Sequence, residues 1–287
     1  MSPSILQLIL AALLWSTGGV LVKAIDWSPL AIAGMRSAIA AVTLLVLVRR
    51  PRFHWSATQI LAAFFYAGTV VLFVLSTRLT TAANAIFLQY TAPIYIALLS
   101  GPLLGEKPTR FDWAMTALAF SGICLFFLDQ LSASGVWGIV LATISGLSFA
   151  GLSITMRKQK TGSPIESVIL GNGLAALVGL PAILTAGAPS GQAPWAGLLV
   201  LGVFQLALAY WLYAKAIKHV PVLQAVIITT CEPILNPLWV MFFIGEKPGR
   251  WSIAGGALVI AAATLRALKS NRPEAPGEAV AESLTAR

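Results

Sequence analysis

Apolar residues in this chain gather in long runs, and most charged residues stand between the runs. Each run is about twenty residues long, the length that an α-helix needs to cross roughly 30 Å of hydrocarbon. Backbone groups inside a bilayer have no water to bond, so helices rather than open strands are expected. The pattern predicts ten membrane-spanning helices, at residues 5–24, 29–48, 57–77, 83–104, 110–128, 135–156, 164–185, 195–217, 222–244 and 250–268.

Composition supports a chain surrounded by lipid. Hydrophobic residues make up 58% of its 287 residues and charged residues only 10%, whereas a soluble domain carries about 25% charged residues. So little charge cannot cover a water-facing surface. We therefore expect an all-α, multi-pass membrane protein in a lipid bilayer. Tryptophans near the ends of the runs fit interfacial positions, namely Trp27, Trp55, Trp113, Trp137, Trp195 and Trp251.

Basic residues are distributed unevenly between the two ends of the predicted helices. If the N-terminus lies in the cytoplasm, fourteen lysines and arginines fall in cytoplasmic segments, and four fall outside: Lys23, Arg78, Lys247 and Arg250. Cytoplasmic loops of membrane proteins carry such an excess. The distribution predicts that both termini are cytoplasmic. It also accounts for the net charge of +9 without a nucleic-acid partner.

A charged phrase recurs at an offset of 140 residues. Residues 91–111 read TAPIYIALLSGPLLGEKPTRF, and residues 231–251 read CEPILNPLWVMFFIGEKPGRW. Matches between apolar residues arise easily by chance, but GEKP followed by an arginine in the same register does not. The repeat predicts two units, residues 1–130 and 135–270. The tail at residues 271–287 is rich in Pro, Glu and Ala and is predicted to be disordered.

Each unit holds five predicted spans, and an odd number has a consequence for topology. A unit with five spans ends on the opposite side of the membrane from its start, so its second copy is inverted. Inverted repeats are typical of secondary transporters, which bind cargo near the midplane between the repeats. The sequence therefore predicts a 5+5 inverted-topology repeat around a central cavity, working by alternating access. A duplicated receptor, enzyme or structural bundle is the alternative.

Ten spans, two five-span halves and a P…LLGEKP phrase in the fourth span that is echoed in the ninth resemble the EamA family of the drug/metabolite transporter superfamily. Within it the chain is most similar to the bacterial aromatic amino-acid exporters of the YddG type. The resemblance implies a multi-pass exporter of small metabolites in the bacterial plasma membrane, with amino acids, aromatic ones above all, as cargo. One feature departs from symmetry, because Glu232 precedes Pro233 whereas Ala92 precedes Pro93.

Two charged residues lie deep inside predicted spans. Arg36 and Glu232 would each cost about 2.5–3.5 kcal/mol at the bilayer centre, so neither is expected to face lipid. One hypothesis is that both line the cavity, with Arg36 binding a cargo carboxylate and Glu232 an ammonium group or a proton. The alternative is a structural ion pair between them.

Polar, proline and aromatic residues at similar depths complete the predicted cavity. Prolines inside spans interrupt the helix and free backbone groups, and aromatic rings stack on planar apolar cargo. All of these residue types also serve as ordinary packing residues. The predicted cavity lining is Trp15, Ser16, Gly19, Arg36, Tyr66, Gln89, Tyr90, Pro93, Tyr95, Asn172, Tyr210, Trp211, Thr230, Glu232, Pro233 and Asn236.

Nothing in the sequence predicts an enzyme, a cofactor or a metal site. The motifs GxxxxGK[ST] and HExxH are absent, and Cys124 and Cys231 stand alone as packing residues. Ten spans enclose one cavity in one chain, so a monomer is expected to suffice. Aromatic rings with Glu232 would also suit a cationic or quaternary ammonium compound through cation–π contacts. A channel or receptor is the remaining alternative.

Overall fold

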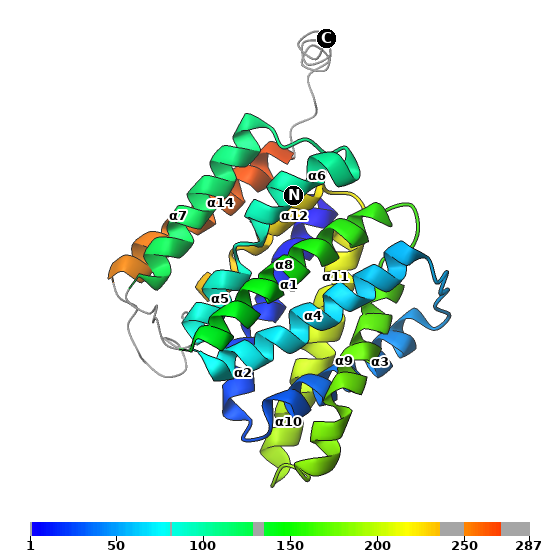
Figure 1. Ribbon diagram of the computed structural model, residues 1–287. Coiled ribbons are helices and arrows are strands. Elements are labelled where there is room, and N and C mark those ends of the chain that lie inside the picture. The colour runs from blue at the N-terminus through cyan, green and yellow to red at the C-terminus, as the bar shows by residue number, and fades with distance from the viewer. Residues whose placement is uncertain (1, 81, 129–134, 236–249, 271–287) are drawn as a thin grey trace.

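The computed structural model describes residues 2–80, 82–128, 135–235 and 250–270, and their regular structure is entirely helical (Figure 1). Six of the described helical segments are long and apolar enough to cross a membrane. Helical residues lie within all ten predicted spans. The uninterrupted helices are α3 (Pro29–Val48), α4 (Ala57–Leu79), α7 (Arg110–Phe127), α8 (Val136–Lys158), α9 (Ile165–Thr185) and α14 (Arg250–Ser270).

The other spans are built from shorter helices. They are α1 (Pro3–Ser16) with α2 (Gly18–Ala24), α5 (Ala82–Gln89) with α6 (Ala92–Leu104), and α10 (Gln192–Val200) with the π-helix η1 (Leu201–Leu208) and α11 (Ala209–Ala216). A further helix, α12 (Val222–Thr229), is followed by a helical turn at 232–235. The second GEKP phrase and the tail lie outside the described residues.

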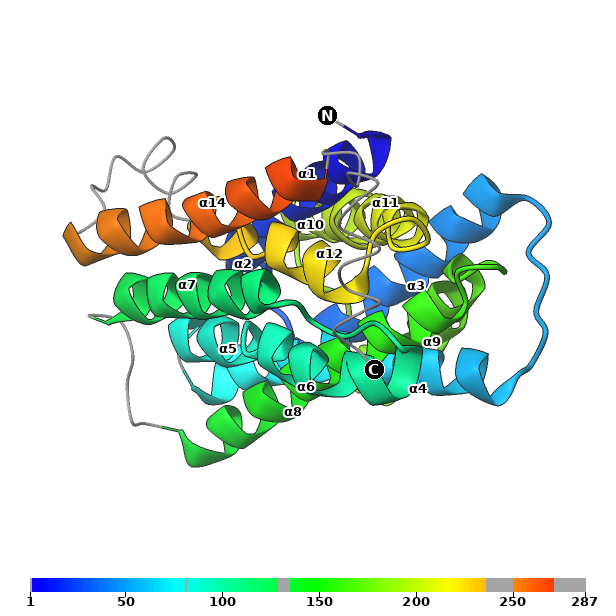
Figure 2. The ribbon, with the colours of Figure 1, turned by 90° about the horizontal axis from the view of Figure 1, so that it is seen from above.

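Helices from the two predicted units pack against each other throughout. The main contacts join α4 to α8 and α9, α3 to α9, α1 to α11, and α7 to α14. Figures 1 and 2 show α7 and α14 side by side along one flank. Each of these contacts pairs a helix before residue 130 with one after residue 135. The two units therefore interlock and share one interior, and do not form two separate bundles.

A pair of glycines sets the crossing of α3 and α9. A Cβ atom placed on Gly34 would lie 2.7 Å from the Cα of Gly179, and one on Gly179 would lie 2.5 Å from the Cα of Gly34. No side chain fits between the two backbones at this point. Small residues at such crossings let membrane helices approach closely and gain dispersion contacts.

Threonines close three helices at mid-span. Thr17, Thr91 and Thr230 each donate a side-chain hydroxyl hydrogen bond to the carbonyl oxygen three residues earlier, at 2.7, 2.6 and 2.5 Å. These bonds satisfy carbonyl groups that a continuing helix would otherwise have used. The backbone can therefore break inside the apolar layer without leaving those groups unpaired.

Two of the breaks lie just before prolines that are predicted to interrupt their spans. The helix is interrupted at residues 90–91 and 230–231, and it resumes with Pro93 and Pro233 in the new first turn. Proline fits a first turn because its missing N–H needs no partner there. The two interruptions lie 140 residues apart, which is the offset of the sequence repeat.

One prediction needs correction. The first span, expected to be continuous over 5–24, is broken at Thr17. The first GEKP phrase forms the turn between α6 and α7. Gly105 ends α6 in the left-handed conformation, with φ of 72°, which glycine adopts without strain. Thr109 caps α7 in a reciprocal capping box with Asp112.

Candidate functional site

A cavity of about 50 Å³ lies where the broken helices meet. It is bounded by α1, α3, α4, α5, α8, η1 and α11, so both predicted units contribute. A smaller cavity of about 20 Å³ adjoins it and shares Trp15, Phe73, Gln205 and Glu232. The main cavity is lined by Trp15, Arg36, Thr69, Val70, Phe73, Gln89, Tyr90, Phe149, Gln205, Leu206, Tyr210 and Glu232.

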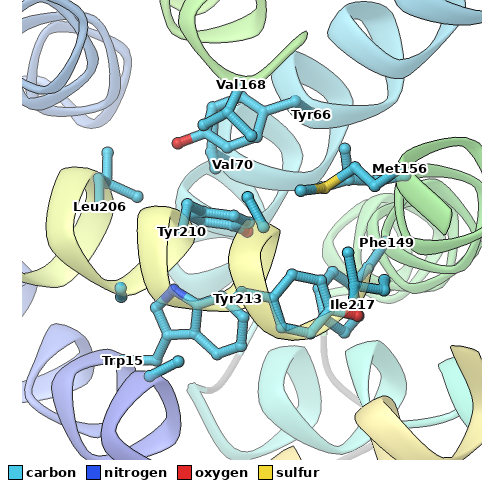
Figure 3. Packing of buried hydrophobic residues seen from close by; sticks show 14 of the residues in the cluster. Trp15, Tyr66, Val70, Phe149, Met156, Val168, Leu206, Tyr210, Tyr213 and Ile217 are labelled. Atoms are coloured by element: carbon cyan, nitrogen blue, oxygen red, sulfur yellow. The ribbon is translucent and has the colours of Figure 1, made fainter. Parts of the chain in front are cut away.

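The rings of Trp15, Phe149 and Tyr210 form an aromatic wall of the cavity. They pack against the neighbouring rings of Tyr66 and Tyr213 (Figure 3). Tyr210 lies between Trp15 and Tyr66, with ring centroids 4.9 and 4.7 Å apart and the rings close to edge-to-face. Tyr213 packs 5.3 Å from Trp15 and donates its hydroxyl to Ser153 at 2.8 Å. Edge-to-face pairs are the favourable arrangement for such rings. The wall is therefore a packed unit and not a row of independent side chains.

Arg36 is buried, with 2% of its surface exposed. Its Nη1 donates to Oε1 of Gln205 at 3.4 Å, and its Nη2 donates to the carbonyl oxygen of Val70 at 3.1 Å. The Nε–H finds no acceptor among the described residues. A guanidinium has five donors, so Arg36 retains donors that the protein does not use.

Glu232 sits at the point where the helix after α12 resumes. The hydroxyl of Tyr90 donates to its carboxylate, and Tyr90 itself lies at the break between α5 and α6. The two helix interruptions therefore bring a hydroxyl and a carboxylate together. Nearby, Gln89 donates to the hydroxyl of Ser145 at 2.9 Å, and Ser145 donates to the carbonyl oxygen of Thr69 at 2.9 Å.

Arg36 and Glu232 line the same cavity without pairing. The ion pairs found among the described residues join Arg157 to Glu106 and Arg266 to Asp112. The structural ion pair between Arg36 and Glu232, one of the two sequence hypotheses, is not present in this conformation. Each charge instead has neutral partners, so both remain able to meet charges of a bound molecule.

The structure brings together many, but not all, of the predicted site residues. Nine line one of the two cavities: Trp15, Ser16, Gly19, Arg36, Gln89, Tyr90, Tyr210, Glu232 and Pro233. Six others line neither cavity: Tyr66, Pro93, Tyr95, Asn172, Trp211 and Thr230. Asn236 lies outside the described residues.

The six residues that line neither cavity make packing contacts or hydrogen bonds within the fold. Tyr66 lies behind Tyr210, Asn172 donates to its own helix at the carbonyl oxygen of Val168, and Thr230 closes α12. The ring of Trp211 is covered by Lys215, whose Nζ lies 3.4 Å from the ring centre. Pro93 occupies the first turn of α6, and Tyr95 packs against the main core.

Six residues that line the main cavity were not among the predicted ones: Thr69, Val70, Phe73, Phe149, Gln205 and Leu206. Four of them are apolar and have no feature that separates them from packing residues. Gln205 did carry a signal, because a glutamine inside a long apolar run needs polar partners. Thr69 donates its hydroxyl to the carbonyl oxygen of Phe65 in its own helix, so its presence in a span does not by itself indicate a cavity.

Comparison with known proteins identifies the family. The profile of the EamA-like transporter family matches residues 2–128 and again residues 136–267. The chain belongs to the EamA-like transporter family. It is thus a multi-span membrane protein, and the family resemblance seen in the sequence is confirmed. The fold agrees, since a solved crystal structure with 19% identity superposes with a TM-score of 0.79 over 94% of this chain and 99% of the other.

Relatives of this EamA-family chain are named as transporters and not as enzymes. An uncharacterized transporter from Archaeoglobus fulgidus is 30% identical over 88% of this chain and 92% of its own length. The transporter YwfM of Bacillus subtilis is 31% identical over 90% of this chain and 93% of its own length. The threonine/homoserine exporter RhtA of Salmonella typhimurium is 26% identical over 80% and 79%.

Proposed function

We propose that this protein is a secondary transporter that exports small metabolites, with amino acids, preferentially aromatic ones, as cargo. The observation that carries the proposal is the main cavity, whose lining combines a cation, an anion and an aromatic wall. A zwitterion with an aromatic side chain complements all three features.

The charges of the cavity suit a zwitterionic cargo. A buried charge is costly unless it is paired and hydrogen-bonded, and Arg36 and Glu232 do not pair with each other. The guanidinium fork matches a carboxylate geometrically. Glu232, held by Tyr90, is the complementary group for an ammonium or a proton. A cargo with both charges would compensate both residues at once.

The size of the cavity implies movement during transport. A cavity needs about 10–15 Å³ for one water molecule, so 50 Å³ holds a few waters but no amino acid. Cargo entry therefore requires side chains or helices to move aside. The mid-span breaks at residues 90–91 and 230–231 are natural places for that movement, because the backbone ladder is already interrupted there.

Export and amino-acid cargo draw support from the relatives, since one of them is named as a threonine/homoserine exporter. Aromatic preference draws its support from Trp15, Tyr210 and Phe149 in the cavity. We keep one alternative cargo, a cationic or quaternary ammonium compound, because Glu232 lies close to the same rings. Arg36 in the same cavity disfavours such a cargo through charge repulsion.

Alternating access through a 5+5 inverted repeat is the proposed mechanism. Two matches to one family profile, at residues 2–128 and 136–267, support units at 1–130 and 135–270. The equal spacing of the helix breaks and the interlocked helices add to this support. We further propose a monomer in the bacterial inner membrane, with both termini and the tail at 271–287 in the cytoplasm.

The test is transport by the purified protein in liposomes. Labelled tryptophan, phenylalanine, threonine and benzyltrimethylammonium are compared side by side in counterflow. We expect saturable exchange that is fastest for tryptophan and phenylalanine. A preference for the quaternary ammonium would favour the alternative cargo. Flux without saturation would indicate a channel, and indifference to all three amino acids would reject the proposed cargo.

A further inference from the structure

Gln205 connects the buried arginine to both cavities. Its side chain lines the main cavity and the adjoining one. Arg36 has only donors, so the contact of 3.4 Å requires the carbonyl oxygen of Gln205 to face the guanidinium. The amide nitrogen then faces α2, where a Cβ atom placed on Gly18 would lie 2.8 Å from it.

Two irregular backbone segments place this side chain. Gln205 belongs to η1, and π-helical turns inside α-helices are rare and occur frequently at functional sites. Opposite it, the break after α1 puts Gly18 where any larger residue would displace the amide. Irregular backbone at membrane depth is tolerated where it is buried in protein or lines a cavity. Both segments therefore help to place the amide of Gln205 against the guanidinium of Arg36.

Arg36, which this amide contacts, has an unused donor and an uncompensated positive charge. Among the described residues it meets one amide oxygen and one carbonyl oxygen, and its Nε–H is buried without an acceptor. No described carboxylate forms an ion pair with it. A neutral partner orients the guanidinium but does not neutralise its positive charge. A carboxylate in the same place would neutralise it.

We propose that Gln205 is a positioning residue that holds Arg36 for the carboxylate of the cargo and so makes the transporter select carboxylate-bearing molecules. The inference rests on the proposed function and deepens it, since it assigns one element of specificity to a pair of side chains. The cargo class that it requires is a small molecule with a carboxylate at one end. Tryptamine, which has the ring and the amine of tryptophan but no carboxylate, is the matching probe.

The experiment measures how well unlabelled tryptophan and tryptamine compete with labelled tryptophan in liposomes. The wild type is expected to prefer tryptophan by at least about tenfold, which is the worth of one charge-assisted hydrogen bond. Gln205→Glu places a fixed carboxylate on Arg36, so that preference should fall about tenfold or more. Gln205→Met removes the acceptor and should lower it as well. Gln192→Glu, at an exposed position of α10, is the matched control and should keep the wild-type ratio.

A double variant separates positioning from general damage. If Gln205 acts through Arg36, then Arg36→Met and the double variant Arg36→Met/Gln205→Met should show the same ratio. Thermal melting in detergent verifies that each variant is folded, and Gly18→Ala, which pushes the amide without altering it, gives a second route to the same loss. A wild type without preference for tryptophan would reject the proposed function and this inference with it. A wild-type preference that survives in both Gln205 variants would reject the role of Gln205 alone.

Discussion

The Nε of Arg157 lies 2.5 Å from Oε1 of Glu106, and this ion pair ties together three segments at one end of the molecule. Glu106 belongs to the first GEKP phrase, and its other oxygen accepts the backbone N–H of Val222 at 2.9 Å. Arg157, near the end of α8, also donates to the carbonyl oxygens of Ile217 and Lys218 at 2.9 and 2.7 Å. The loop after α6 is thereby fastened to α8 and to the segment between α11 and α12, across the two predicted units.

Removing the charge of Glu106 should destabilise the observed conformation. The side chains of Arg157 and Glu106 are 10% and 20% exposed, so we expect Glu106→Gln to cost about 1–3 kcal/mol, less than a fully buried pair. Thermal melting of the purified protein measures the loss. Asp26→Asn, at an exposed position, serves as the control. An unchanged melting temperature in Glu106→Gln would show that the pair contributes no stability.

The same substitution should also ease access to the cavity from the side of this loop, if access alternates as proposed. Phe73→Cys, in a chain whose native cysteines are replaced by alanine, reports cavity exposure through its rate of labelling by a membrane-impermeant thiol reagent. We expect faster labelling in Glu106→Gln from that side of the membrane and not from the other. Equal rates with and without the substitution would argue against an opening at this face.

Glu232 is expected to be essential for amino-acid flux. Glu232→Gln keeps the shape of the side chain and its contact with the Tyr90 hydroxyl, but it removes the charge that would meet an ammonium group or a proton. Counterflow of labelled tryptophan should fall at least about tenfold at equal amounts of reconstituted protein. Full retention of flux would remove any cargo or proton role from Glu232.

Two glycines in α9 offer a matched test of the helix crossing. Gly179→Ala forces a Cβ atom against the Cα of Gly34, and overpacking of this kind costs about 1–3 kcal/mol. Gly173→Ala lies in the same helix with nothing within 4 Å of its Cβ, so it should be neutral or stabilising because alanine favours helix. We expect a lower melting temperature for Gly179→Ala than for Gly173→Ala. Equal values would contradict the close crossing.

Inverted topology makes a prediction about the two GEKP phrases. Cysteines at Lys107 and Lys247 should react with an impermeant reagent from opposite sides of the membrane, Lys107 from the cytoplasm and Lys247 from outside. Intact cells and inside-out vesicles allow both sides to be probed. Reaction of both positions from one side would reject the inverted repeat and the mechanism built on it.

The sequence by itself determined the helices and their order. Apolar runs of about twenty residues locate the spans, because lipid requires apolar side chains and closed backbone hydrogen bonding over a defined thickness. The deep charges Arg36 and Glu232 were recognisable for the same reason, since charge inside such a run is costly. The repeat could be recognised from the charged phrase, which recurs at an offset of 140 residues.

Only the tertiary structure decided which residues meet. A helix that is apolar on all sides has no hydrophobic stripe to indicate its rotation, so the sequence did not separate Tyr210, in the cavity, from Tyr66 behind it. The break at Thr17 and the contact of Gln205 with Arg36 likewise depend on how distant segments approach. Glu106 and Arg157 are 51 residues apart and became partners only because the folded helices bring their ends together.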